Sequence, residues 1–145
     1  DCDYYSLKDV DDVVVGYFSF LSHVDLLHQN LLDVVFVFVA FLIELFLKYR
    51  LGRAKGRAQE KNLEFDLDHE CLIDLYQQQK GYCAISELPM TSTYENPDLC
   101  ISIDRMDNEV GYIKTNIRLV CYRVNIMRNE LSEGMFKWWI KQIAK

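Results

Sequence analysis

The sequence predicts an α+β protein built on a strand–loop–strand–helix (ββα) unit with flanking helices. Residues 101–104 alternate apolar and polar side chains, which is typical of a half-buried strand. Residues 108–111 supply turn chemistry, and the apolar run 117–120 is expected to be the return strand. A helix is expected next, because apolar residues then recur at steps of three and four: Val124, Met127 and Leu131.

Two further helices are predicted on either side of this unit. Asp66 or Asp68 can cap a helix that runs to Lys80, with Gly81 just past its end. Ser132 is expected to start the last helix. Four apolar residues of that helix fall on one side and predict core packing: Phe136, Trp139, Ile140 and Ile143.

Length and cysteine usage limit the class of protein. A chain of 145 residues, half of them hydrophobic, fits one domain of ordinary size with an ample core. The five cysteines are odd in number and irregularly spaced, which argues against a secreted disulfide framework. We therefore expect an intracellular, reducing compartment.

The net charge of −6 is distributed unevenly. Residues 1–47 hold one base against eight acids, whereas residues 48–145 hold fifteen bases against fourteen acids. This asymmetry predicts an acidic and apolar N-terminal segment, 1–47, and a separate domain, 48–145. The domain's share of the bases fits a polyanionic partner better than the total charge does.

The N-terminal segment contains the most apolar stretch of the chain. Residues 34–43 are an uncharged run of ten, and 31–47 is a run of seventeen with two acids. A membrane span needs about 20 apolar residues, and a shorter run is more typical of a buried helix. We favour a helix (or strand pair) that packs on the domain or, in a homodimer, on a second copy. A membrane anchor, flanked by the bases that follow, is the alternative.

Residues 48–61 form a basic stretch that is predicted to be helical. It carries six bases against one acid, Glu60. The bases are Lys48, Arg50, Arg53, Lys55, Arg57 and Lys61. Contact with DNA phosphates is the functional interpretation, and a solvated helix face or membrane-flanking charge is the structural one.

The ββα stretch 103–127, IDRMDNEVGYIKTNIRLVCYRVNIM, resembles the ββα-metal core of HNH-type endonucleases. The resemblance is to a subgroup of phages and large viruses that reads roughly S-I-D-R-I-D, G-Y, a spaced Asn and V-N-x-M-K. It extends over about residues 48–140 and leaves out 1–47. It implies a metal-dependent endonuclease that hydrolyses DNA phosphodiester bonds, working in the host cytoplasm if the chain is viral.

The resemblance also assigns roles to four residues. Asp104 falls on the metal-ligand position, Arg105 on the position of the histidine base, Asn116 on the loop-tethering asparagine and Asn125 on the helical metal ligand. Oxygen ligands suit Mg²⁺ or a similar divalent ion. Such an ion would stabilise charge on the phosphate and the leaving oxygen.

Arg105 departs from the family pattern. A guanidinium stays protonated and cannot accept a proton from water, although it can hold a phosphate. Asp107 is then the first candidate for the base, ahead of Glu109 and Tyr112, and a metal-bound hydroxide is another solution. The alternative is a non-catalytic DNA-binding or assembly module in which Asp104, Arg105 and Asp107 form a structural salt-bridge cluster.

Predictions for DNA contacts and for zinc complete the site. Arg123 and Arg128 on the ββα helix are expected to lie against the duplex. Arg53, Lys55 and Arg57 are expected to contact phosphates. Where relatives have two C-x-x-C pairs, this chain keeps one thiol in each, Cys83 and Cys121. A closed zinc site takes four ligands, so structural zinc is not expected and the two thiols should pack together.

Overall fold

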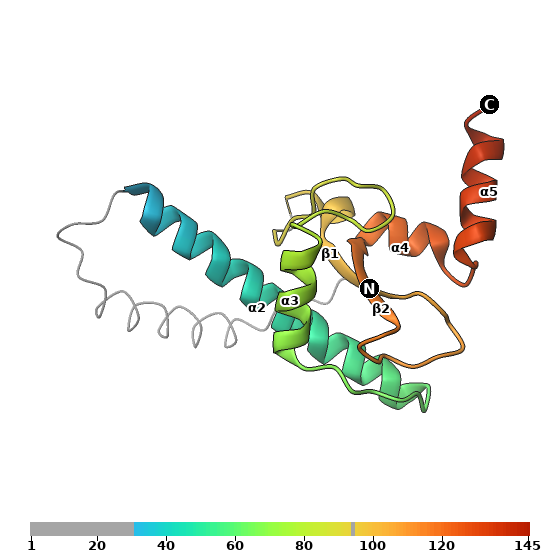
Figure 1. The fold of residues 1–145 in the computed structure, drawn as a ribbon, viewed down its shortest axis with the longest axis horizontal. Helices are drawn as coiled ribbons and strands as arrows, with labels where there is room; N and C mark the ends of the chain where they lie inside the picture. The colour runs from blue at the N-terminus through green and yellow to red at the C-terminus, as the bar shows by residue number, and fades with distance from the viewer. Residues whose placement is uncertain (1–30, 94) are drawn as a thin grey trace. The chain divides into compact units, whose positions relative to one another are not determined.

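The computed structural model describes residues 31–93 and 95–145, and its contacts divide the chain into two compact units, Asp1–Phe38 and Val39–Lys145. Described helices and strands follow the order expected of an α+β protein (Figure 1). In order they are α2 (Leu31–Glu60), α3 (His69–Gln78), the 3-10 turn η1 (Pro97–Leu99), β1 (Ile101–Arg105), β2 (Ile117–Cys121), α4 (Tyr122–Arg128) and α5 (Glu133–Ile143). The α+β class is therefore confirmed.

Helix α2 contains both the apolar run and the basic stretch that follows it. It runs unbroken for 30 residues through the apolar run and the basic stretch. The predicted boundary after residue 47 lies inside this helix, because Phe46 and Leu47 are buried with Ala54 and Ala58 in the core of the second unit. Within the described part of the chain, no helix is long and apolar enough to cross a membrane. Residues 1–30 lie outside the described residues, and a homodimer through the N-terminal segment stays a prediction.

Helix α3 begins as predicted and ends slightly early. Asp68 is its N-cap, with Oδ1 accepting from the backbone N–H of Cys71 at 2.7 Å. Its last residue is Gln78, and Gly81 beyond it takes φ +75°, a value that favours glycine. His69 lies against α2, with Nε2 2.9 Å from the carbonyl oxygen of Glu44.

The ββα order is present, with a more deeply buried hairpin than predicted. β1 and β2 pair antiparallel with Ile103 opposite Leu119 and Asp104 opposite Arg118. The alternation in β1 predicted a polar face open to water. Instead Ser102 and Asp104 are 6% and 3% exposed, because side chains of β2 and α4 contact them.

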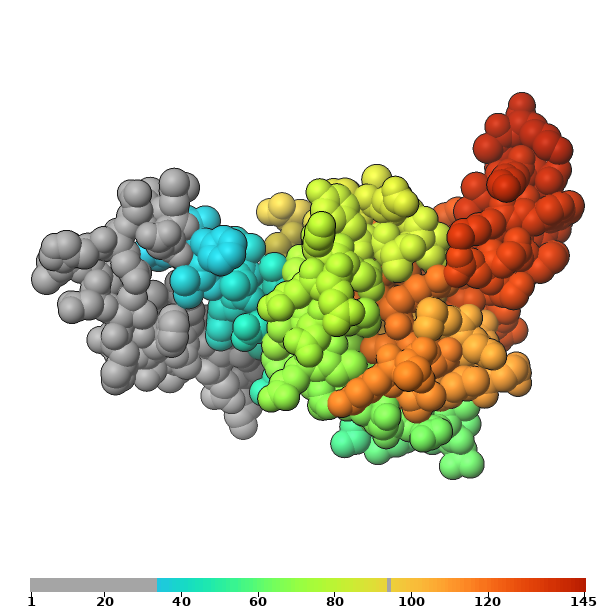
Figure 2. Space-filling view, viewed as in Figure 1, coloured from blue at the N-terminus to red at the C-terminus, as the bar shows by residue number. Residues whose placement is uncertain are grey.

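The predicted core stripe of α5 is wrong for three of its four residues. Ser132 caps the helix as predicted, accepting from Met135 N at 3.3 Å, and Phe136 is 4% exposed. The exposed large side chains of this helix are Met135, Trp138, Trp139, Ile140 and Ile143. Only the first turn of α5 is packed against the rest of the protein, and the helix extends away from α4 (Figures 1 and 2).

Candidate functional site

The carboxylate of Asp104, near the end of β1, is enclosed by two arginines. Arg118 Nε on β2 donates to Oδ2 at 2.8 Å. Arg128 on α4 donates to Oδ1 from Nη2 at 2.8 Å and from Nε at 3.1 Å. The Arg128 side chain is 1% exposed and that of Asp104 is 2% exposed. Both oxygens of Asp104 are thus engaged by buried guanidinium groups.

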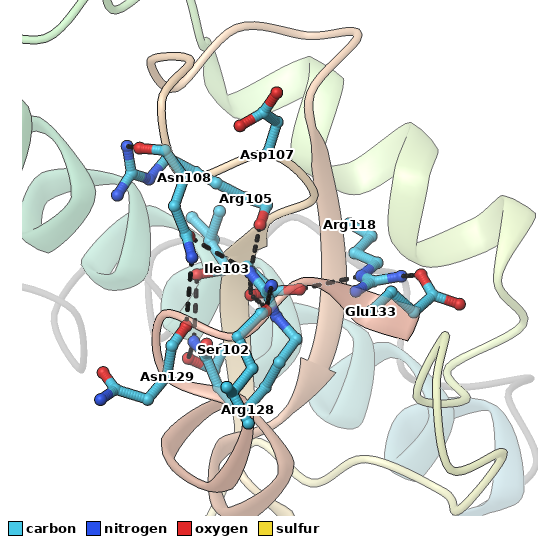
Figure 3. A network of polar contacts seen from close by, with 12 residues as sticks. Ser102, Ile103, Arg105, Asp107, Asn108, Arg118, Arg128, Asn129 and Glu133 are labelled. Atoms are coloured by element: carbon cyan, nitrogen blue, oxygen red, sulfur yellow. Dashed lines mark hydrogen bonds and ion pairs between the residues drawn. The ribbon is translucent and has the colours of Figure 1, made fainter. Parts of the chain in front are cut away.

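This network connects the hairpin to the two helices that follow it (Figure 3). Arg118 also donates to Glu133 Oε2 at 2.5 Å, at the start of α5. Arg128 also donates to the carbonyls of Leu131, at 2.5 Å, and Arg105. Lys137 and Arg118 lower the pKa of Glu133 to about 2. Removing one partner of such a buried ion pair destabilises the folded state strongly, because the other charge is left buried without a partner.

The proposed metal ligands lie on the same side of the ββα unit but do not form a cation site in this conformation. Asn125 Nδ2 donates to Ser102 Oγ at 2.8 Å and to the carbonyl of Ile103 at 3.3 Å. Ser102 and Asp104 are alternate residues of β1, so Asn125 and Asp104 lie along one face. A divalent cation needs an electronegative oxygen cage, whereas Asp104 is surrounded by positive charge. Among the described residues, no group of three acidic, cysteine or histidine side chains could hold a metal ion.

Arg105, at the position of the family's base, is turned toward the loop. Its Nη1 donates to the carbonyls of Asn108 at 2.8 Å and Val110 at 2.9 Å. Its Cζ lies 5.1 Å from the ring centre of Tyr112. The predicted salt-bridge cluster of Asp104, Arg105 and Asp107 is therefore wrong. The arginines that pair with Asp104 are Arg118 of β2 and Arg128 of α4.

Asn116 holds the loop between the strands. Its Nδ2 donates to the carbonyls of Asp107 at 2.9 Å and Gly111 at 3.0 Å, and its Oδ1 accepts from Asp107 N at 2.9 Å. The carboxylate of Asp107 accepts from Glu109 N at 2.9 Å and is exposed. In Figure 3 Asp107 points away from the contact between Arg118 and Glu133. The first candidate for the base thus lies apart from the Asp104 network.

The predicted DNA-facing residues of α4 behave differently from expectation. Arg128 is buried, so the prediction that it lies against a duplex is wrong, because Asp104 and three carbonyl or amide oxygens hold it inside. Arg123 is exposed, but its Nη2 lies 2.7 Å from Asp98 Oδ1. That carboxylate raises the pKa of Arg123 and neutralises its charge. Helix α4 therefore offers little uncompensated positive charge.

The basic residues of α2 remain at the surface or over aromatic rings. Arg53 and Lys55 are exposed, as are Lys48 and, directly after the helix, Lys61. Arg57 is half-buried, with Nε donating to Tyr112 Oη at 3.0 Å. The structure therefore separates the predicted phosphate contacts on α2 from the buried arginines around Asp104.

Cys83 and Cys121 are buried, 2% and 1% exposed, as free thiols. The backbone N–H of Ser86 donates to Cys83 Sγ at 3.4 Å. Burial, together with the neighbouring Cys83 thiol, raises the pKa of Cys121 to about 11. The two thiols are neighbours, in agreement with the predicted packing.

Comparison with known proteins gives one informative similarity. Over 84 residues, 58% of this chain, it is 32% identical to an uncharacterized 29.0 kDa protein encoded in the dda-modA intergenic region of Enterobacteria phage T4. The chain spans about a third of the length of that protein (32%). No family model and no solved structure matches the chain.

Proposed function

We propose that residues 39–145 form a DNA-binding domain of the ββα type, in which Asp104 has a structural role. The observation that carries this proposal is the pairing of Asp104 with Arg118 and Arg128, which removes it from solvent. The resemblance of the sequence around Asp104 to HNH-type endonucleases supports a nucleic acid as the binding partner. The similarity to a phage protein agrees with a viral or phage origin.

The basic part of α2 supplies the DNA-facing surface. Lys48, Lys55 and Lys61 are exposed, and no salt bridge joins them to a carboxylate in the described part of the chain. Exposed lysines bind phosphates without reading bases, so affinity should depend strongly on salt and weakly on sequence.

Fluorescence anisotropy with a labelled duplex, titrated over NaCl in EDTA, tests this proposal. We expect binding without divalent metal and a linear fall of log K with log salt. Replacing Lys48 and Lys55 of α2 and Lys61 directly after it by glutamine should reduce the salt slope by about 2 to 3.

The matched control removes three charges from the C-terminal part of the chain. Lys137 and Lys141 lie on α5 and Lys145 follows its end, and replacing the three by glutamine changes the net charge of the protein equally. The control triple should leave the slope near that of the wild type. Equal losses in both triples would show a general charge effect and contradict a binding surface on α2.

The second candidate function is the metal-dependent endonuclease, and the position of Asn125 beside the Asp104 face favours it. Arg128 would have to leave Asp104 before that carboxylate could bind a cation. Plasmid nicking in Mg²⁺ or Mn²⁺, compared with EDTA, tests this function. The better control is Asn125→Ala, because Asp104→Ala also removes two buried ion pairs. Nicking that disappears in EDTA and in Asn125→Ala would support the enzyme, and its absence would count against it.

A further inference from the structure

Six of the seven arginines of the chain fall into two sets that are held in chemically different ways. Arg118, Arg123 and Arg128 each pair with a carboxylate. Arg50, Arg57 and Arg105 instead lie over aromatic rings. In the described part of the chain, no carboxylate lies within salt-bridge distance of these three. An arginine held by a ring or a carbonyl keeps its full positive charge.

Two arginines of the second set meet at Tyr112. The Cζ of Arg57 lies 5.6 Å and that of Arg105 5.1 Å from the ring centre of Tyr112. Arg57 comes from α2 and Arg105 from the end of β1, so segments 48 residues apart converge on one side chain. Both arginines are half-buried, so part of each residue is open to solvent.

The Tyr112 ring is a fixed support. It is 6% exposed, and its backbone is hydrogen-bonded on both sides: N donates to the Glu64 carbonyl at 2.8 Å, and O accepts from Asp66 N at 3.1 Å. Phe65 packs against the ring with a centroid separation of 6.3 Å. Cations over such a ring are held with little loss of charge.

Donors remain on both guanidinium groups. Arg57 uses Nε for Tyr112 Oη, and Arg105 uses Nη1 for the loop carbonyls of Asn108 and Val110. The remaining N–H groups match phosphate oxygens, which arginine binds bidentately. Because the side chains are already positioned, ordering them on binding costs little.

We propose that Arg57 and Arg105, set around Tyr112, form a binding site for the phosphodiester backbone of DNA. This inference rests on the proposed DNA-binding function and assigns the phosphate contact to the junction of α2 with the strand-connecting loop. Asp107 and Glu109, exposed in the same loop, are the acids that oppose binding there. Their neutralisation, as Asp107→Asn with Glu109→Gln, should therefore tighten DNA binding.

The test compares Arg57→Gln and Arg105→Gln in the full chain with wild type in the salt titration of duplex binding. Each substitution should lower the salt slope by about 1 and the affinity on the order of tenfold at 0.1 M salt. Arg123→Gln is the matched control, because Asp98 already neutralises that exposed arginine. It should bind DNA as the wild type does.

The outcomes separate this site from the proposed function. If the wild type binds DNA and both glutamine variants match Arg123→Gln, the Tyr112 site is overturned while DNA binding stands. If the wild type does not bind DNA, both the Tyr112 site and the proposed DNA-binding function are overturned. Should a glutamine variant unfold in a thermal melt, Arg57→Lys and Arg105→Lys carry the test. The site predicts a retained slope with weaker binding, since lysine keeps the charge without the planar fork, and unchanged affinity would contradict it.

Discussion

Arg128 contacts Asp104 with its side chain almost wholly buried and two of its nitrogens within 3.1 Å of one carboxylate oxygen. The last residue of α4 is thereby fixed to the strand that opens the ββα unit. Asp104, the acid that the sequence places at the metal-ligand position, therefore anchors α4 to β1.

Removing the anchor should destabilise the protein strongly. Asp104→Ala leaves Arg118 and Arg128 buried without a common partner, and we expect a loss of about 3 to 5 kcal/mol in unfolding free energy. Urea denaturation followed by circular dichroism measures this loss. The control, Arg123→Gln, breaks an exposed pair and should unfold with the wild type. A wild-type midpoint for Asp104→Ala would contradict the anchoring role.

Glu133 should make stability depend on acid pH. Lys137 and Arg118 lower its pKa from 4.5 to about 2, so the folded state favours the charged form. A lowered pKa contributes stability that is complete above about pH 4.5 and is lost as the pH falls toward 2. The difference in unfolding free energy between wild type and Glu133→Gln should therefore be largest at neutral pH and vanish near pH 2. A difference that grows on acidification would contradict this assignment.

Two glycines should respond to alanine in opposite directions. A Cβ at Gly111 would overlap the backbone carbonyl of Glu64, beside the bond that positions Tyr112, so Gly111→Ala should cost about 1 to 3 kcal/mol or more. A Cβ at Gly56, within α2, would meet nothing within 4 Å, and Gly56→Ala should stabilise by about 0.5 to 1 kcal/mol. Thermal melts of the two variants check the signs. Equal shifts would show that the loop does not press on the 60–66 connection.

Loss of the Asn116 side chain should loosen the loop between the strands. Asn116→Ala removes its bonds to Asp107 and Gly111, and we expect about 2 kcal/mol of destabilisation. Hydrogen exchange measured by NMR should show faster exchange at the Asp107 amide. Thr115→Ala, at an exposed neighbour, is the control and should leave that amide protected. Unchanged exchange in Asn116→Ala would contradict the tethering role.

Local features of the fold were accessible from sequence because they depend on nearby residues. The caps Asp68 and Ser132 and the ββα order were all read from spacing and residue type. The continuity of α2 was not, since Gly52 and Gly56 suggested interruptions that a helix packed by Ala54 and Ala58 tolerates.

The partners of the site residues were less accessible. Asp104 pairs with residues 14 and 24 positions away, and period-two alternation indicates which face a side chain occupies but not what it meets there. One signal was available: in the hairpin, Arg118 stands directly opposite Asp104. For α5, periodicity located the apolar face correctly, but whether Trp139 or Ile143 is covered depends on tertiary packing that the pattern does not contain.

The salt dependence of duplex binding by the full chain, measured by anisotropy in EDTA, tests the central claim most directly. We expect metal-independent binding whose log K falls linearly with log salt, with a smaller slope for Arg57→Gln and an unchanged slope for Arg123→Gln. Absence of binding by the wild-type chain at 50 mM salt would contradict it.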